Sequence, residues 1–391
     1  MIDFDGAARL TLGLARPLGS ERVPIAEAAG RILSAPLLAR GDSPRAAVSA
    51  MDGYAIRTGA ATRYRLIGQS FPGSGFDGEV GEGEAVRIFT GAPVPAGADR
   101  VVIQENVRRD GEDAVLEAPP DGPDHVRPQG SDFRAESALL DPGTRLGPRA
   151  MVAAGGADRA DVEVFRRPQV TVMGTGDELL EPGTAHLSRF GIPESVSLGV
   201  AALTEAWGGV CLARLRLSDD LDLLKQAARK ALEQSDVVVV TGGASVGDRD
   251  FARAMFEACG LELVFSKVEI KPGKPVWLGQ ALGKLILGLP GNPTSAMVTG
   301  RLFLAPLLSG LSGSDPNAAL SWRQAPLASP LAATGDRETF YRAKAGGEGL
   351  TPFSDQDSGS QKVLADADVL IRRRPFEPAA PAGEAVTVLD F

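Results

Sequence analysis

The residue types best suited to chemistry lie in a Gly-rich segment, residues 241–250, which reads TGGASVGDRD. It follows the apolar run 236–241 and precedes a predicted helix. In open α/β sheets, ligands bind where the strands end. Gly242 and Gly243 let the backbone approach a ligand, and a helix N-terminus offers free N–H groups to an anion. We therefore predict a ligand loop, in which Asp250 either caps the helix or binds Mg²⁺.

A lysine cluster provides a second candidate site. Three of the eight lysines, Lys267, Lys271 and Lys274, fall within eight positions. On a predicted strand Lys267, Glu269 and Lys271 share one face because side chains alternate, and a Pro-Gly turn returns Lys274 toward them. Like charges repel unless an anion lies between them. A solvated basic strand is the alternative, but the chain otherwise uses Arg for its basic surface, so we favour an anion site.

Two further turns follow predicted strands. Residues 174–178 read GTGDE after the strand at 170–173, and residues 288–293 read GLPGNP after the apolar LIL run. Either segment could be an ordinary turn. However, the turns after parallel strands converge on one edge of a sheet. With the ligand loop, they predict a pocket for a phosphate group and a metal ion.

The surrounding elements indicate several domains. From residue 169 onward, strands alternate with helices, which predicts a doubly wound α/β domain of about 140 residues. Its strands are expected at 170–173, 211–217, 236–241 and around 261–270, and its helices at 195–207, 220–234, 251–259 and from Pro293. Residues 46–130 show short apolar runs between turn residues, typical of a β-rich domain, and so do the residues after 312. Helical patterns precede and follow the first β-rich region.

Composition excludes several classes of protein. The 391 residues are 43% hydrophobic and carry a net charge of −9, which disfavours a nucleic-acid partner. Cys211 and Cys259 alone cannot build a disulfide framework, and His125 and His186 lack the context of a metal site or a catalytic triad. The N-terminus lacks a signal-peptide pattern, and no run of about 18 apolar residues occurs. We expect a cytoplasmic protein that binds neither nucleic acid nor membrane.

Six motifs in fixed order carry a resemblance over essentially the whole chain: SAMDGYA, TGAPVPAGAD, GTGDEL, TGGASVGDRD, KPGKP and GLPGNP. Together they resemble the molybdopterin molybdenumtransferase family, which includes MoeA and the C-terminal part of gephyrin. The resemblance implies a multidomain α/β plus β fold. Its expected parts are a discontinuous helical linker domain (1–45 and 135–165), an inserted β-rich domain (46–134), a doubly wound molybdopterin-binding domain (166–311) and a C-terminal β-barrel (312–391).

The resemblance also implies an activity, the last step of molybdenum cofactor assembly. In that reaction, adenylated molybdopterin and molybdate give molybdenum cofactor and AMP, with Mg²⁺ required. Family members are homodimers, and the molybdopterin adenylyltransferase and acceptor apo-molybdoenzymes are implied protein partners.

By similarity, each motif receives a function. Carboxylates for Mg²⁺ and the phosphate-bearing substrate come from Asp250, Asp220 and Glu178, and Lys267, Lys271 and Lys274 attract molybdate and phosphates. The pterin's phosphate end is held by the loop of Gly242, Gly243, Ser245 and Gly247, the pocket is shaped by Pro290 and Pro293, and Ser358 contributes from the terminal domain. Asp52, Thr90 and Asp132 come from the second subunit, so the implied catalytic set is Asp250, Glu178, the three lysines and Asp52.

The chain departs from the family pattern at a few positions. Glu194 and Val196 stand where Asp and Asn are usual, the pair Met173-Gly174 stands where Ser is common, and Asp368 replaces Asn. The missing amide at Val196 removes a hydrogen-bond donor and an acceptor at a predicted helix start. This leaves open a non-catalytic carrier of molybdopterin or finished cofactor. A scaffold or a nucleotide hydrolase are weaker alternatives, and a hydrolase leaves MDGYA and TGAPVP unexplained.

Overall fold

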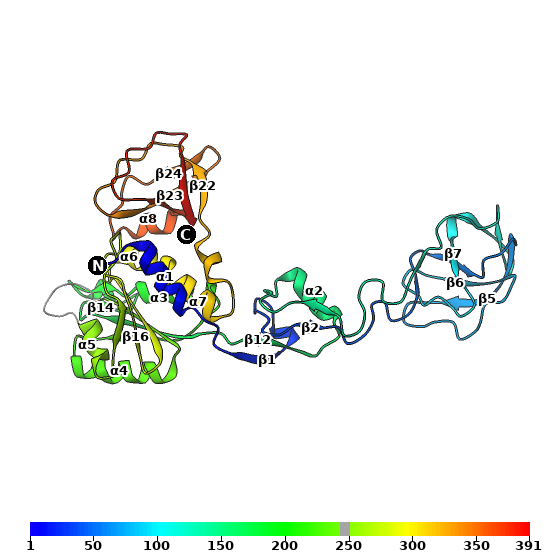
Figure 1. Cartoon of the computed structure of the whole chain (residues 1–391), viewed down its shortest axis with the longest axis horizontal. Helices are drawn as coiled ribbons and strands as arrows, with labels where there is room; N and C mark the ends of the chain where they lie inside the picture. Colours follow the sequence, from blue (N-terminus) through cyan, green and yellow to red (C-terminus); the bar gives the residue numbers. More distant parts are fainter. Residues whose placement is uncertain (243–250) are drawn as a thin grey trace. The chain divides into compact units, whose positions relative to one another are not determined.

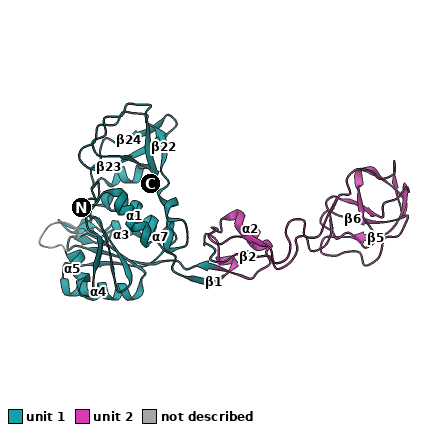
Figure 2. Ribbon diagram, in the orientation of Figure 1, with its two compact units in different colours: residues 1–21, 30–34, 164–391 teal, residues 22–29, 35–163 magenta. Residues whose placement is uncertain are grey.

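The computed structural model describes residues 1–242 and 251–391. These residues form two compact units, shown in different colours in Figure 2. Unit 1 comprises residues 1–21, 30–34 and 164–391, and unit 2 comprises residues 22–29 and 35–163. Each unit has hydrophobic clusters of its own.

A six-stranded sheet forms the centre of unit 1 (Figure 1). In spatial order its strands are β16 (Val210–Leu217), β13 (Gln169–Thr175), β17 (Val237–Thr241), β21 (Lys284–Leu289), β20 (Trp277–Ala281) and β18 (Glu262–Phe265). The first four are parallel, whereas β20 and β18 are antiparallel to their neighbours. All five residues of β17 are buried, as expected for a central strand covered on both faces. The predicted doubly wound domain is therefore confirmed, with an antiparallel edge added.

Two helical layers cover the sheet because successive strand residues point to opposite faces. Val237 and Val239 pack in a cluster with α3 (Val196–Ala206), α6 (Pro293–Thr299) and α7 (Ala305–Leu311). Val238 and Val240 pack in the opposite cluster with α4 (Leu221–Gln234) and α5 (Phe251–Glu257). The helix predicted from Pro293 is present, with the proline in its first turn.

The longest apolar helix of unit 1 is a core helix. Residues 293–311, which include a π-helical stretch at Gly300–Leu304, are long and apolar enough to cross a membrane by length and composition. However, 94% of the most apolar window is buried inside the protein. Packing against α1 (Phe4–Leu14) and α3 accounts for this apolar character.

The C-terminal residues form a second sheet in unit 1. Its strand order is β19 (Ile270–Lys271), β23 (Glu338–Gly346), β25 (Val369–Arg373), β26 (Ala385–Asp390) and β22 (Arg323–Pro326), with β24 (Gly349–Pro352) also paired to β23. A short helix, α8 (Gln361–Asp366), precedes β25. Helix α1 is tied to this sheet, because Arg372 forms ion pairs with Asp5 and Glu338. The first residues of the chain thus help to hold the terminal β-domain.

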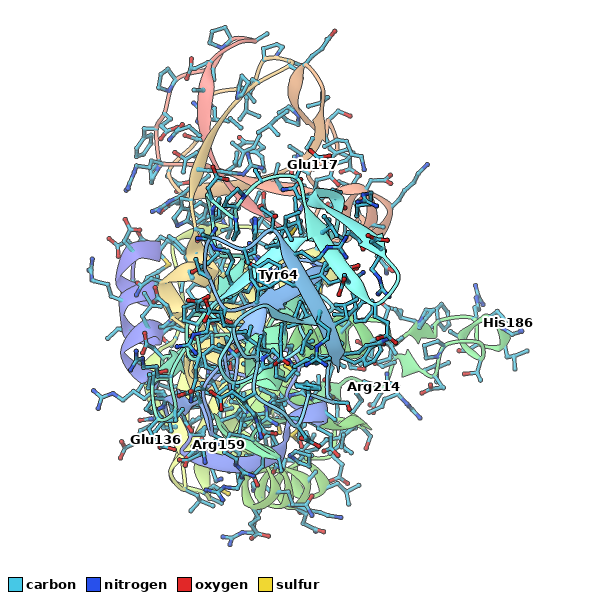
Figure 3. All side chains as sticks on the ribbon, turned by 90° about the vertical axis from the view of Figure 1, so that its right-hand side faces the viewer. Tyr64, Glu117, Glu136, Arg159, His186 and Arg214 are labelled. Atoms are coloured by element: carbon cyan, nitrogen blue, oxygen red, sulfur yellow. The ribbon has the colours of Figure 1, made fainter. Side chains whose placement is uncertain are left out.

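Unit 2 is mostly β-structure. Its main sheet has the order β7 (Arg100–Ile103), β4 (Gly53–Ile56), β6 (Glu84–Ile88), β5 (Arg63–Ser70), β9 (Asp113–Leu116) and β8 (Val107–Asp110). Further pairs are β3 (Val48–Ser49) with β10 (Val126–Arg127), and β2 (Leu37–Leu38) with β11 (Ala138–Leu140). Helix α2 (Pro148–Gly156) follows. Strands β1 (Ser20–Pro24) and β12 (Asp161–Phe165), which pair with each other, each have residues in both units. Glu136 and Arg159, labelled in Figure 3, form an ion pair at 3.3 Å. The finer domain boundaries expected above remain a prediction.

Candidate active site

A cavity of about 690 Å³ lies where β13, β17 and β21 end. It is lined by residues of the turns that follow these strands, including Thr175, Glu178, Thr241, Gly242, Pro290, Gly291, Asn292 and Pro293. The strands are parallel and neighbouring, so their carboxyl ends meet at one sheet edge. The structure therefore brings together the described parts of the three Gly-rich turns.

Two glycines at this edge have positive φ angles and lie so close to neighbouring atoms that a side chain would clash. Gly242 has φ +90°, and a Cβ there would lie 2.6 Å from the carbonyl oxygen of Thr175. Gly176 has φ +147°, and its Cβ would lie 2.7 Å from the carboxylate of Glu178. Only glycine allows both the positive φ and the close approach. The two turns therefore pack tightly, and Glu178 folds over its own turn.

The lysine segment corrects the sequence interpretation. The single strand expected around residues 261–270 is wrong, because β18 ends at Phe265 and β19 joins the C-terminal sheet through β23. Lys267 and Lys271 therefore do not share a strand face. Alternation alone could not reveal that the chain leaves one sheet for another between these residues.

The chain nevertheless turns back as the Pro-Gly sequence predicts. The Val268 N–H donates to the Lys274 carbonyl at 3.0 Å, which closes the loop. Both Lys267 and Lys274 line the first cavity. Lys271 instead lines a second cavity.

The second cavity has a volume of about 500 Å³ and adjoins the first, since Lys274 and Pro275 line both. Its other lining residues are Lys271, Pro272, Gly273, Ser295, Arg337, Gln356, Asp357 and Ser358. Three cationic side chains and one carboxylate thus surround a small space. Arg337 was missed by sequence reasoning, because no spacing rule links it to a lysine loop more than 60 positions earlier.

A C-terminal loop forms one wall of this cavity. Asn292 Nδ2 donates to Ser358 Oγ at 2.8 Å, and the Thr294 N–H donates to the Ser358 carbonyl at 3.1 Å. Thr294 Oγ1 also donates to the Ser360 carbonyl at 3.2 Å. The GLPGNP turn is therefore bonded to the loop that carries Ser358.

Glu194 is a second residue whose place sequence reasoning missed. Its side chain lines the first cavity yet only 6% of the residue is exposed. The backbone N–H of Ser197 donates to Oε1 at 2.9 Å, and the Ser197 hydroxyl donates to Oε2. Glu194 thereby binds the first turn of α3 in the manner of a helix cap.

The three departures from the family pattern at Gly174, Glu194 and Val196 lie in one region. Gly174 adjoins Glu194, and both Glu194 and Val196 line the first cavity. A Cβ at Gly174 would lie 3.5 Å from Oε1 of Glu194, which is an ordinary contact, so the two positions adjoin without glycine being required. Val196 lines the cavity with Ile192 and Leu179, which gives this wall an apolar character.

That apolar wall continues into an exposed segment. β14 (Leu179–Leu180) pairs in parallel with β15 (Ile192–Pro193), and the residues between them project outward. Figure 3 shows His186 at the outer end and Arg214 nearer the body of the domain. Leu187 is 79% exposed and Phe190 is 76% exposed. This segment therefore presents apolar side chains to solvent beside the cavity.

The residues expected to bind Mg²⁺ lie in different settings. Glu178 lines the first cavity. Asp220 caps α4, since its Oδ1 accepts the N–H groups of Asp222 and Leu223 at 3.0 and 3.1 Å. Asp250, Gly243, Ser245 and Gly247 lie outside the described residues.

Within residues 1–242 and 251–391, no group of three or more His, Cys, Asp and Glu side chains could hold a metal ion. Magnesium is usually bound by one or two carboxylates together with substrate phosphates and water. Of the two described residues expected to bind Mg²⁺, Glu178 lines the first cavity and Asp220 does not.

Of the three candidate residues in unit 2, Asp52 and Thr90 are hydrogen-bonded to each other and Asp132 lies elsewhere. Asp52 Oδ1 accepts the backbone N–H of Thr90 at 2.7 Å and its hydroxyl at 2.8 Å. These two bonds, the backbone bond first, lower the pKa of Asp52 below its ordinary value. Asp132 lies on another turn, where its N–H donates to the Ser43 carbonyl at 3.0 Å. Asp52 is therefore an ionised, oriented carboxylate.

Three family models match the chain. The MoeA N-terminal region (domain I and II) matches residues 2–156, a probable molybdopterin binding domain matches residues 171–310, and the MoeA C-terminal region (domain IV) matches residues 324–391. The chain belongs to the MoeA family. The matched binding domain contains the first cavity's Gly-rich turns, and the C-terminal region contributes Arg337 and Ser358 to the second cavity.

Individual MoeA-family proteins agree with this assignment. The molybdopterin molybdenumtransferase of Haemophilus influenzae is 33% identical over 338 residues, covering 85% of this chain and 82% of that protein. The protein of that name from Staphylococcus aureus Mu50 is 30% identical and covers 94% and 90%. The crystal structure of a molybdopterin biosynthesis MoeA protein from Pyrococcus horikosii superposes with a TM-score of 0.85 at 29% identity, covering 99% and 98%.

Proposed function

We propose that this MoeA-family chain is a molybdopterin molybdenumtransferase, which inserts molybdate into adenylated molybdopterin and releases AMP during molybdenum cofactor biosynthesis. The observation that carries the proposal is the pair of adjoining cavities that share Lys274. The larger has room for a pterin joined to a nucleotide, and the smaller presents three cations to a small oxyanion. Relatives named as transferases support this function over a non-catalytic carrier.

The described residues have separate tasks in this proposal. Lys267 and Lys274 attract the phosphates of adenylated molybdopterin, and Lys274 with Lys271 attracts molybdate. In the step that releases AMP, a water oxygen attacks the phosphorus of the molybdopterin phosphate and loses its proton to solvent. The phosphoanhydride P–O bond breaks as the new bond forms, AMP leaves with the bonding electron pair, and nearby ammonium groups stabilise the charge that develops on it. Pro290 and Pro293 keep the wall between the turns rigid.

Magnesium belongs to the proposal as an ion held by Glu178, by the substrate phosphates and by Asp250. When bound, it would neutralise phosphate charge. Asp220 fits its capping function better than a ligand function, because Oδ1 already accepts two backbone N–H groups and the residue is absent from the described lining of the first cavity.

The proposal includes an assembly. A homodimer would let Asp52, Thr90 and Asp132 of the second subunit complete the site. The enzyme would act in the cytoplasm, receive its substrate from the molybdopterin adenylyltransferase and pass its product to acceptor apo-molybdoenzymes. Size-exclusion chromatography with light scattering tests the dimer, and a monomer at assay concentration would contradict that part.

Reconstitution tests the function. Purified protein is mixed with adenylated molybdopterin, molybdate and Mg²⁺, and both AMP release and activation of an apo-molybdoenzyme are followed. We expect both signals, and we expect both to be lost in Asp250→Asn and after chelation of Mg²⁺. Binding of the adenylated pterin without either signal would support the carrier instead.

A further inference from the structure

Arg342, on β23, is an unusual buried cation. The residue is 0% exposed, and its Nε, Nη1 and Nη2 atoms have no hydrogen-bond partner within the part of the chain that the structure describes. Taking a guanidinium out of water is unfavourable unless another charge offsets the loss of hydration. Some feature near Arg342 must therefore favour the charge.

The nearby opposite charges lie on one loop. Burial lowers the pKa of the Arg342 guanidinium, while the carboxylates of Asp355 and Asp357 act to raise it. Asp357 lines the second cavity, whereas Asp355 precedes it in the same turn and accepts its N–H at 2.8 Å. The electrostatic energy of Arg342 thus depends on where this loop lies.

The same loop is bonded to the backbone of Arg342. The Arg342 N–H donates to Gln356 Oε1 at 3.1 Å, and Gln356 Nε2 donates to the Arg342 carbonyl at 3.0 Å. At its other end the loop is bonded to Asn292 and Thr294 through Ser358. Residues 356–358, which line the second cavity, therefore lie between two anchors.

We propose that Arg342 is a positioning residue, which holds the loop of residues 355–358 against the second cavity by charge and thereby sets the affinity of that cavity for molybdate. The inference rests on the proposed function for the identity of the oxyanion. Arg342 does not line the cavity in the described structure and so acts through Asp355, Gln356 and Asp357.

Equilibrium binding of molybdate to the full chain, followed by calorimetry, tests the inference. Arg342→Met removes the charge at similar volume, and we expect molybdate affinity to fall about tenfold because the attraction that orients Asp355 and Asp357 is lost, while the bonds of the loop to the backbone of residue 342 and to Asn292 remain. Arg342→Lys restores the charge and should recover much of the affinity. The melting temperature should stay equal or rise, because methionine leaves no buried partner unsatisfied.

Arg301→Met is the matched control. Arg301 is also buried, but it donates to the carbonyls of Asp390 at 2.8 Å and Ala319 at 2.7 Å, away from the loop. This variant should lower the melting temperature and leave molybdate affinity unchanged. Asp355→Asn should weaken binding in the wild-type background and have little further effect in Arg342→Met, because both changes remove the same attraction.

Each outcome has one meaning. Unchanged molybdate affinity in Arg342→Met, or no measurable molybdate binding by the wild type, overturns the inference. Loss of affinity in Arg342→Met together with absent AMP release by the wild type keeps the positioning function and refutes the transferase. Normal AMP release by the wild type, together with equal molybdate affinity in the wild type and Arg342→Met, supports the transferase and refutes the positioning function.

Discussion

The two adjoining cavities differ in how the chain assembles them. The first is built largely from turns that follow the parallel strands β13, β17 and β21 of one domain. The second combines the 271–275 loop, Ser295 of α6, Arg337 and the 356–358 loop, which lie on two sheets and their connections. The first cavity is therefore centred on turns of the parallel sheet, with Gln361 added from the C-terminal region, whereas the second needs residues of both sheets to close it.

The largest effect should come from Lys274, the charged residue that lines both cavities in the described structure. Lys274→Ala removes a cation from each, so we expect AMP release to fall about 100-fold, within the range found when a single charge-stabilising group is lost. Initial rates at saturating substrates measure this. Lys344→Ala is the control, because Lys344 pairs with Asp368 on the terminal sheet at 3.5 Å. Equal rates for both variants would remove Lys274 from the site.

The other two lysines should separate the cavities. Lys271→Ala should raise the KM for molybdate about tenfold and leave that for adenylated molybdopterin near normal, while Lys267→Ala should do the opposite. Both KM values are measured for each variant. If both lysines affected both constants equally, the cavities would function as one site.

The close packing of the first cavity can be tested at one glycine. Gly242→Ala places a Cβ against the Thr175 carbonyl at positive φ, so we expect destabilisation of about 1–3 kcal/mol together with weaker pterin binding. Urea unfolding and binding titrations measure the two effects. Gly183→Ala has a similar φ of +95° but nothing within 4 Å, so it should cost less stability and leave binding intact.

The apolar wall predicts a smaller effect. Val196→Asn supplies an amide beside Ile192 and Leu179, and we expect a change of about threefold in the KM for adenylated molybdopterin, in line with a modest hydrogen-bond contribution. The KM for molybdate should stay constant. A shift in the molybdate constant alone would place Val196 in the function of the second cavity.

The smallest effect concerns Asp52 in unit 2. Thr90→Ala removes the hydroxyl bond and keeps the backbone bond, so the pKa of Asp52 should rise part of the way toward its ordinary value. The pKa of Asp52 is lower in the folded state than in the unfolded state. The two bonds therefore stabilise the fold fully at pH values above the unfolded-state pKa, and this stabilisation is lost as the pH falls through the folded-state pKa. Carboxyl NMR titration measures the shift. At neutral pH, Thr90→Ala should lower the free energy of unfolding only slightly, because the Asp52 carboxylate is exposed to solvent.

Sequence patterns predicted one cavity well and the other poorly. The apolar run at Val237–Thr241 and the Gly-rich turns predicted a buried parallel strand whose following turn meets its neighbours at one sheet edge, and the structure has both features. The lysine segment was misjudged, because side-chain alternation does not reveal that Lys271 belongs to a strand paired with β23. Arg337 carried no local signal at all.

Local patterns along the chain define the elements and the turns, since periodicity, glycine placement and helix caps act over a few residues. Asp3 capping α1 and Pro293 starting α6 are such local choices. Which charges meet depends on how the elements pack in three dimensions. Lys274 lines two cavities, Glu194 adjoins Gly174, and the backbone of Arg342 is bonded to Gln356 of the 355–358 loop, because chain segments far apart in sequence pack together. Electrostatic interactions act through space, so their partners follow from packing and not from spacing along the chain.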